Sequence, residues 1–327
     1  MITRRRVVLA LGAGALAPFA SFAQQPPAKV FRIGFLGLAS ASRWASRVEA
    51  LRSGLRDLGY VEGKNIVIEY RWAEGKNDRL PELAAELVRL RVDVLVTHST
   101  PGSLAAKRAT TTIPIVMVHS GDAVATGIVA SLARPGGNLT GMIFFSPEIN
   151  AKTLELIKDA LPRTKRVAVL LNSDNPINGP VLQAMERTAK SLKVELQLFE
   201  VRGPNDFNGA FSVMPKKRID AVIVQEDPIF IVNAKEVADL AAKHRLPSAG
   251  FKEFAEAGGM IGYGVNFLDL YRRAAYFVDK ILKGAKPGDI PIERATRFEL
   301  VVNMKTAKAL GIKLPNSILL RPDKVIE

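Results

Sequence analysis

The stretch that decides the fold runs from Val92 to Gly141: VDVLVTHSTPGSLAAKRATTTIPIVMVHSGDAVATGIVASLARPGGNLTG. It contains two short apolar runs, 94–96 and 115–118, and small polar residues follow them at 97–100 and 119–122. Short apolar runs that alternate with helical patterns predict buried parallel strands, and we expect a helix after each of these two strands. Ligands of such sheets bind in the crevice outside the carboxyl ends of the strands. The stretch therefore predicts a crevice that closes around a small molecule.

The remainder of the chain continues this alternation in two series of strands and helices. The first series has further predicted strands over 30–36, 65–72 and 139–145, and helices over 43–58 and 77–88. The second series has predicted strands over 167–171, 194–201, 221–224, 247–250 and 260–263, with helices over 151–161, 180–192, 206–213 and 231–244. A helix over 268–282, a strand over 297–302 and a helix over 304–310 follow, and we expect them to return the chain to each domain in turn.

The two series also resemble each other in sequence. Three pairs of segments recur in the same order: 91–96 with 218–223, 32–36 with 166–170, and Ile113-Pro114 with Leu246-Pro247. A mature chain of about 300 residues is longer than one core usually holds. We therefore expect two doubly wound, Rossmann-like α/β domains with parallel sheets: an N-terminal lobe over 29–144 plus 267–296 and a C-terminal lobe over 145–266 plus 297–327.

The first residues are typical of a signal peptide that covers 1–23. Arg4-Arg5-Arg6 is a basic start, an apolar run follows, and Ser21-Phe22-Ala23 fits the cleavage rule. Thr3-Arg4-Arg5 also fits the start of a twin-arginine signal, although Val7-Val8 stands where that signal usually has Phe-Leu. The apolar run is shorter than the roughly 20 residues of a membrane span. We expect export to the periplasm. Because the chain has no cysteine, a lipoprotein anchor, a disulfide and a thiol nucleophile are excluded.

Charge and motifs exclude several function classes. The formal net charge is +14, but the basic residues are dispersed and not interleaved with aromatics, so we expect no nucleic acid partner. Neither GxGxxG nor a P-loop is present, so no nucleotide cofactor is indicated. His98 and His119 lack a further placed carboxylate for a metal site. Ser99, His119 and Asp122 would suit a hydrolase triad, but Thr97 and Pro101 occupy the glycine positions of GxSxG, so no enzyme is predicted.

Several segments of the chain resemble a known family. The chain is similar to type I periplasmic substrate-binding proteins, and among them to the ABC transporter binding proteins that include tryptophan and phenylalanine binders. The residues that carry this resemblance are IPIV at 113–116, Asp122, GIVASLARPGGNLTG at 127–141, Tyr263-Gly264, and the segment from Val302 to Gly311. The family usually has Asp-Pro-Val where this chain has Asp122-Ala123-Val124.

The resemblance implies two lobes joined by a multi-strand hinge, with a ligand held between them by hinge closure. It further implies a monomer that delivers its ligand to an inner-membrane ABC permease, without catalysis. An amino acid or a related carboxylate, aromatic ones included, is the implied ligand class. An exported sensor that presents its bound ligand to a membrane signalling partner is the alternative, because the same closure would serve it.

The candidate ligand-binding residues follow predicted strands or precede predicted helices. Hydroxyls and free N–H groups there suit a carboxylate, carboxylates suit an ammonium group, and aromatic rings stack on an apolar group. The same residue types also cap helices, form turns and fill cores, and these structural roles remain alternative interpretations. The candidates are Ser40, Ser42, Ser99, Thr100, Ser120, Asp122, Asn172, Asn175, Glu226, Asp227, Phe251 and Tyr263, with Asp174 and Phe230 as weaker ones.

Overall fold

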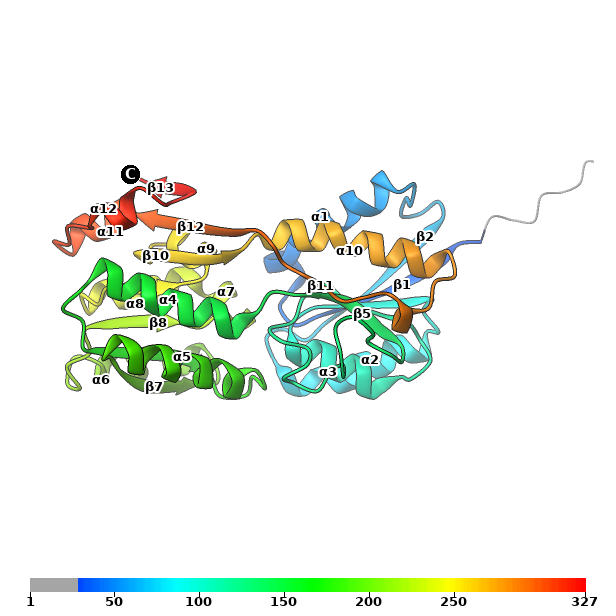
Figure 1. Ribbon diagram of the computed structural model, residues 1–327. Coiled ribbons are helices and arrows are strands. Elements are labelled where there is room, and N and C mark those ends of the chain that lie inside the picture. The colour runs from blue at the N-terminus through cyan, green and yellow to red at the C-terminus, as the bar shows by residue number, and fades with distance from the viewer. Residues whose placement is uncertain (1–28) are drawn as a thin grey trace, which may run out of the picture.

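The computed structural model describes residues 29–327, so the predicted signal peptide lies outside the described residues. Two sheets lie side by side, each with helices on both faces (Figure 1). The first sheet has the strand order β11-β5-β4-β3-β1-β2 and is parallel throughout. Its strands are β1 (Phe31–Gly37), β2 (Ile66–Trp72), β3 (Val94–Thr97), β4 (Ile115–Met117), β5 (Leu139–Ile143) and β11 (Glu293–Arg294).

The first sheet and its helices form lobe 1. The helical elements are α1 (Ala41–Asp57), η1 (Asn77–Arg79), α2 (Leu80–Arg89), α3 (Thr100–Ala109), α10 (Phe267–Leu282) and η2 (Pro287–Asp289). Successive residues of a strand face opposite sides, so Phe35 packs with α1 and α10, whereas Leu36 packs with α2 and α3. Helices α1 and α10 approach closely at Gly54, where a Cβ atom would lie 2.5 Å from the carbonyl oxygen of Arg272. Only glycine fits that contact.

The second sheet, with its helices, forms lobe 2. Its strand order is β13-β12-β10-β9-β8-β6-β7, and β12 runs antiparallel to β10. The strands are β6 (Arg166–Asn172), β7 (Glu195–Val201), β8 (Ala221–Val224), β9 (Ser248–Gly250), β10 (Ile261–Val265), β12 (Phe298–Asn303) and β13 (Lys324–Ile326). The helices are α4 (Ser146–Ala160), α5 (Asn178–Leu192), α6 (Pro204–Val213), α7 (Pro228–Val232), α8 (Ala234–Lys243), α9 (Lys252–Glu256), α11 (Met304–Ala309) and α12 (Asn316–Leu319).

The internal repeat seen in the sequence is present in the fold. The order β2-β1-β3-β4-β5 of lobe 1 recurs as β7-β6-β8-β9-β10 in lobe 2. Asp93 Oδ2 accepts a hydrogen bond of 2.7 Å from the backbone N–H of Arg32, and Asp220 Oδ2 accepts one of 2.8 Å from that of Arg166. Each carboxylate thereby fixes the start of the first strand of its own lobe. The expectation of two α/β lobes of one plan is confirmed.

Three segments cross between the lobes, at 144–145, 266 and 295–297. Two of them run close together, since the backbone N–H of Ala295 donates to the carbonyl of Ile143 at 2.8 Å. Figure 1 shows these crossings between the two sheets. The predicted multi-strand hinge is confirmed.

One predicted helix is wrong. After β4, residues 118–138 form a series of turns where the sequence predicted a helix. Asp122 Oδ1 accepts from the backbone N–H groups of Val124 and Ala125, both at 3.0 Å, which closes a turn. Gly127, Gly136 and Gly137 have positive φ, and Pro135 lacks an N–H group, so this apolar stretch cannot continue as a helix. The short elements β11, β13, α9 and α12 were not predicted.

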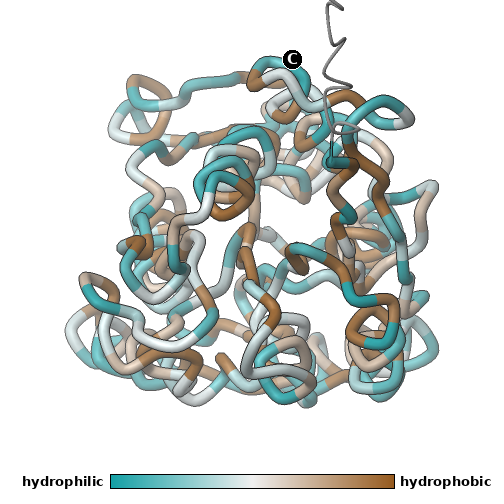
Figure 2. Tube along the Cα trace, turned by 90° about the vertical axis from the view of Figure 1, so that its right-hand side faces the viewer, coloured by the Kyte–Doolittle hydropathy of each residue, from teal (hydrophilic) through white to brown (hydrophobic). Residues whose placement is uncertain are grey.

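The distribution of apolar residues agrees with these layers. Figure 2 shows hydrophobic and hydrophilic residues interspersed along the trace, with no long segment of one kind. No helix between residues 29 and 327 has both the length and the apolar character that crossing a membrane requires.

Candidate functional site

In lobe 1 the carboxyl ends of β3 and β4 bring hydroxyl groups to the face toward lobe 2. Ser99 caps α3 with its Oγ 3.4 Å from the backbone N of Gly102, and its φ of 65° is rare for a non-glycine residue. Thr100 Oγ1 lies 3.0 Å from Ser120 Oγ and accepts from the backbone N–H of Gly121 at 3.4 Å. Backbone strain of this kind is characteristic of binding and catalytic sites. The result is a buried cluster of hydroxyls at a helix N-terminus.

In lobe 2 the ends of β6 and β8 present acidic and amide side chains. Asp227 Oδ2 accepts from Asn175 Nδ2 at 2.7 Å and from Asn172 Nδ2 at 3.2 Å, and its Oδ1 accepts from the backbone N–H of Ile229 at 2.8 Å. Burial raises the pKa of the Asp227 carboxyl, and these hydrogen bonds oppose the rise. Asp227 therefore organises the two asparagines and caps α7.

Glu226 differs from its neighbour because it has no partner of its own. No hydrogen bond or ion pair joins its carboxylate to any residue of 29–327. Burial raises the pKa of the Glu226 carboxyl to about 8, the charges of Asp227 and Glu253 add to the rise, and Arg47 opposes it. A positive group placed beside Glu226 would relieve this cost.

The two lobes together line a small cavity of about 10 Å³. That is room for about one water molecule and lies far below the roughly 300–1,000 Å³ that is usual for drug-sized ligands. Both lobes and the first crossing contribute to its lining, which consists of Ser99, Thr100, His119, Gly121, Phe144, Ser146, Asn175, Ile177, Glu226 and Pro228. Hydroxyls of lobe 1 and a carboxyl of lobe 2 thus face one closed space.

Two buried histidines lie in lobe 1 at and behind this cavity. Burial and the charge of Arg47 lower the pKa of His98 to about 3, and burial lowers the pKa of His119 well below its usual value. His119 packs against Phe267 with ring centroids 4.7 Å apart. Within the part of the chain that the structure describes, neither ring nitrogen of His119 has a hydrogen-bond partner. A neutral imidazole that lines the cavity is therefore free to bond to a ligand.

Across residues 29–327, no group of three or more His, Asp or Glu side chains is placed to hold a metal ion.

The structure brings together only part of the predicted residue set. Ser99, Thr100, Asn175 and Glu226 line the cavity. Ser120, Asn172 and Asp227 are bonded directly to lining residues or to each other.

The other predicted residues lie elsewhere. Ser40 lines a second, more open space between the lobes, and its Oγ is 3.3 Å from that of the exposed Ser42. Asp122 closes the turn after β4. The remaining side chains pack or pair within lobe 2: Phe251 with Phe254, Tyr263 with Phe298, Phe230 with Phe207, and Asp174 with Arg202. Ligand contact by any of these residues stays a prediction.

Sequence reasoning missed several lining residues and one interlobe contact. Phe144 and Ser146 follow β5, so the strand-end rule that selected Ser99 could have found them. Arg47 and Glu253 form an ion pair between the lobes. The available signal was the helical spacing of Arg47, which places it on the same face as Trp44 and Val48. No signal in the sequence linked it to Glu253.

Comparisons with known proteins agree with this geometry. A tyrosine-binding protein of Clostridioides difficile is 29% identical over 261 residues, which cover 79% of this chain and 74% of that protein. An ABC domain from Streptococcus pneumonia, solved in complex with L-Trp, is 26% identical and superposes with a TM-score of 0.84 over 91% of this chain and 100% of that one.

A third comparison concerns the arrangement of the lobes. The ligand-free, open structure of a substrate binding protein with adhesive properties from Clostridium difficile is 25% identical over 91% of this chain and 99% of that one. Its TM-score is 0.66, although identity and coverage match those of the L-Trp complex. This chain therefore has the lobe arrangement of the complex more nearly than that of the open structure.

Residues 38–326 match the family described as ABC transporter substrate binding protein. Proteins of this family are periplasmic or extracellular and bind small molecules. The match spans nearly the whole described chain, and the type I fold, the hinge and the enclosed interlobe cavity accord with it. The chain therefore belongs to the ABC transporter substrate binding protein family.

Proposed function

We propose that this protein is the periplasmic binding component of an ABC importer and that its ligand is an amino acid, aromatic ones included. The observation that carries this proposal is the opposite chemistry of the two lobes around one closed cavity. Hydroxyls and the α3 N-terminus in lobe 1 suit a carboxylate, and the unpaired Glu226 of lobe 2 suits an ammonium group. A zwitterion satisfies both lobes at once.

The lining also supplies an apolar side for the ligand. Phe144, Ile177 and Pro228 line the cavity together with the neutral ring of His119. The relatives that share about a quarter of the sequence are a tyrosine-binding protein and a protein solved with L-Trp, which supports an aromatic amino acid here. The cavity has room for about one water molecule, so an amino acid fits only after the side chains around it have moved.

The proposed units of motion are the two lobes, 29–144 with 267–296 and 145–266 with 297–327. Ligand would enter an open cleft, both lobes would close on it through the three crossings, and the closed monomer would dock on an inner-membrane permease. Export through the N-terminal segment 1–23 completes this proposal.

Calorimetric titration with four matched ligands tests the proposal. L-Tryptophan has both charged groups, tryptamine lacks the carboxylate, indole-3-propionate lacks the ammonium group, and L-leucine lacks the aromatic ring. We expect L-tryptophan to bind at one site per chain, and each analogue that lacks a charge to bind at least tenfold more weakly. Equal binding of indole-3-propionate would show a carboxylate receptor and remove the role of Glu226. No binding of any amino acid would contradict the proposal.

A further inference from the structure

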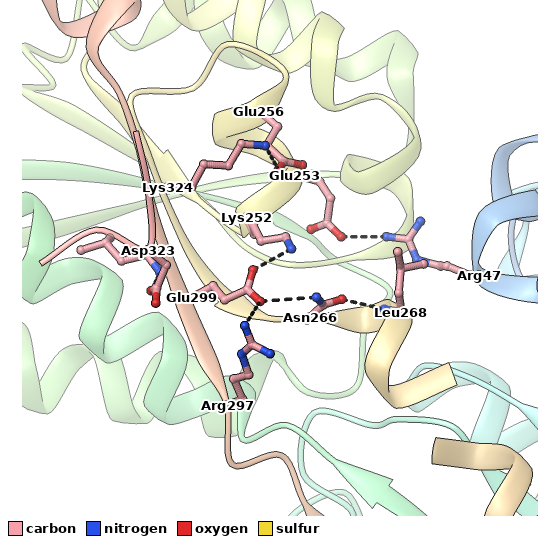
Figure 3. A network of polar contacts seen from close by, with 11 residues as sticks. Arg47, Lys252, Glu253, Glu256, Asn266, Leu268, Arg297, Glu299, Asp323 and Lys324 are labelled. Atoms are coloured by element: carbon pink, nitrogen blue, oxygen red, sulfur yellow. Dashed lines mark hydrogen bonds and ion pairs between the residues drawn. The ribbon is translucent and has the colours of Figure 1, made fainter. Parts of the chain in front are cut away.

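An ion pair between the lobes lies beside the cavity and outside its lining. Arg47 of α1 in lobe 1 donates from Nη2 to Glu253 Oε1 of α9 in lobe 2 at 3.1 Å (Figure 3). The Arg47 side chain is 9% exposed and that of Glu253 is 27% exposed, so water screens the pair only weakly. Because its partners belong to different lobes, this ion pair is broken whenever the lobes move apart.

Lobe 1 holds the guanidinium in place through aromatic rings. The Arg47 guanidinium lies 4.4 Å from the ring centroid of Trp44 and 5.7 Å from that of Phe267. Trp44 is itself fixed, because its Nε1 donates to Tyr271 Oη at 2.7 Å. All of these partners lie on α1 and α10, so Arg47 is oriented by its own lobe. A planar guanidinium stacks on such rings, whereas a lysine ammonium group matches them less well.

Glu253 is tied to the hinge through its neighbour in α9. Lys252 Nζ lies 2.8 Å from Glu299 Oε2, and Glu299 Oε1 accepts from Asn266 Nδ2 at 3.3 Å. Asn266 is the crossing residue before α10, and Glu299 lies in β12, directly after the crossing at 295–297; Figure 3 shows this network around α9. The short helix α9 therefore connects the crossing segments to the contact with Arg47.

The charges around the cavity show why this contact matters for binding. Glu226, Asp227 and Glu253 are three buried or half-buried carboxyls. Burial raises the pKa of both Glu226 and Glu253, and the charge of Arg47 opposes the rise in each. His98, His119 and Tyr271 are further titratable groups on this side, and all three are neutral. All three carboxyls belong to lobe 2, so without Arg47 closure would bury them with no cation from lobe 1 to compensate their charge. Arg47 Nε and Glu253 Oε2 have no partner among the described residues. Arg47 can therefore donate one more hydrogen bond, and Glu253 can accept one.

We propose that Arg47 and Glu253 form an interlobe latch that positions the closed lobes and sets how long the ligand stays bound. The inference rests on the proposed function, since it assumes a ligand held between the lobes. Arg47 and Glu253 act as positioning residues here and lie outside the cavity lining. The ligand supplies the cation for Glu226, the latch supplies an ion pair between the lobes, and closure is stable when both are present.

The test compares rates of binding in matched variants. Glu253→Gln and Arg47→Met should each raise the dissociation rate of L-tryptophan by about 30-fold or more, while the association rate changes by less than about threefold, because loss of one member of a buried charge pair acts mainly on dissociation. The charge-swapped double variant Arg47→Glu/Glu253→Arg should recover part of the loss. Glu49→Gln breaks an exposed ion pair with Arg56 inside lobe 1, and it should leave both rates unchanged. If Arg47 and Glu253 only stabilised their own lobes, the charge-swapped variant would not recover the dissociation rate.

A second readout does not depend on ligand. Because the chain has no cysteine, spin labels can be attached to Arg108→Cys on α3 and Lys190→Cys on α5, which are exposed in different lobes. The ligand-free Arg47→Glu variant should shift the distance distribution to longer values, and the swap should shift it back. Unchanged dissociation rates in both single variants, or identical distance distributions in all three proteins, would overturn the latch. If the unaltered protein binds no amino acid, the proposed function is contradicted. The distances between the spin labels would then still test the latch by themselves.

Discussion

Lobe 1 and lobe 2 share one plan but present different chemistry at the ends of corresponding strands. In lobe 1 the ends of β3 and β4 contribute Thr100, Ser120 and a neutral His119. In lobe 2 the ends of β6 and β8 contribute amides and the carboxyls of Glu226 and Asp227. The aspartates that fix the first strand of each lobe, which both lobes share, lie at the opposite ends of the strands. The repeat preserves the scaffold, and the cleft edges give the site its polarity.

Among the residues that differ between the lobes, we expect Glu226 of lobe 2 to have the largest effect on ligand affinity. Glu226→Gln should weaken L-tryptophan binding about 100-fold, because a charged hydrogen bond in a buried site contributes about 1.5–3 kcal/mol. Calorimetric titration measures this change. The control Glu200→Gln alters an exposed carboxylate of the same lobe and should have no effect. Similar affinities of the two variants would mean that lobe 2 does not hold the ammonium group.

The same carboxyl predicts a pH dependence. Its pKa of about 8 in the closed cleft means that Glu226 is protonated at lower pH, and an ammonium ligand needs the ionised form. Affinity should therefore rise with pH, by up to about tenfold per unit below pH 8, and level off above it. Titrations between pH 6 and pH 9 measure the profile. Indole-3-propionate should lack this dependence, and a flat profile for L-tryptophan would contradict the assignment.

The hydroxyl side should have a smaller effect. Thr100→Val removes one hydroxyl from the lobe 1 cluster with little change in shape and should weaken L-tryptophan binding about tenfold. Tryptamine, which has no carboxylate, should bind equally well to the variant and to the unaltered protein. Thr112→Val, an exposed threonine of lobe 1, is the matched control. If the variant binds both ligands more weakly by the same factor, the Thr100 hydroxyl does not contact the carboxylate of the ligand.

The smallest effect on binding is expected at Asp122. Its carboxylate closes the turn after β4, so Asp122→Ala should lower the free energy of unfolding by about 1 kcal/mol and leave L-tryptophan affinity within about twofold. Thermal unfolding and titration of one preparation separate the two quantities. A large loss of affinity would place Asp122 at the ligand, as the sequence alone suggested.

The comparison of lobes also shows what the sequence could and could not predict. Alternating apolar runs predicted both sheets, and the strand-end rule found Ser99, Thr100, Asn175 and Glu226, because both depend on local order along the chain. The turn at 118–138 was missed because its apolar residues suggest a helix, while the Asp122 cap and glycines with positive φ determine the backbone. The pairing of Arg47 with Glu253 depends on how two lobes meet, which no local pattern encodes.

The close approach of α1 and α10 at Gly54 has a consequence for synthesis. The core between these helices includes Trp44 and Tyr271, which are 227 residues apart in the chain. Lobe 1 therefore cannot bury that face of its sheet until residue 282 has left the ribosome, after β6 to β10 of lobe 2 have already been made. Although domains generally fold in the order of their synthesis, here the lobe that begins first is completed after most of the second, and its folding intermediate exposes an apolar sheet face in the meantime.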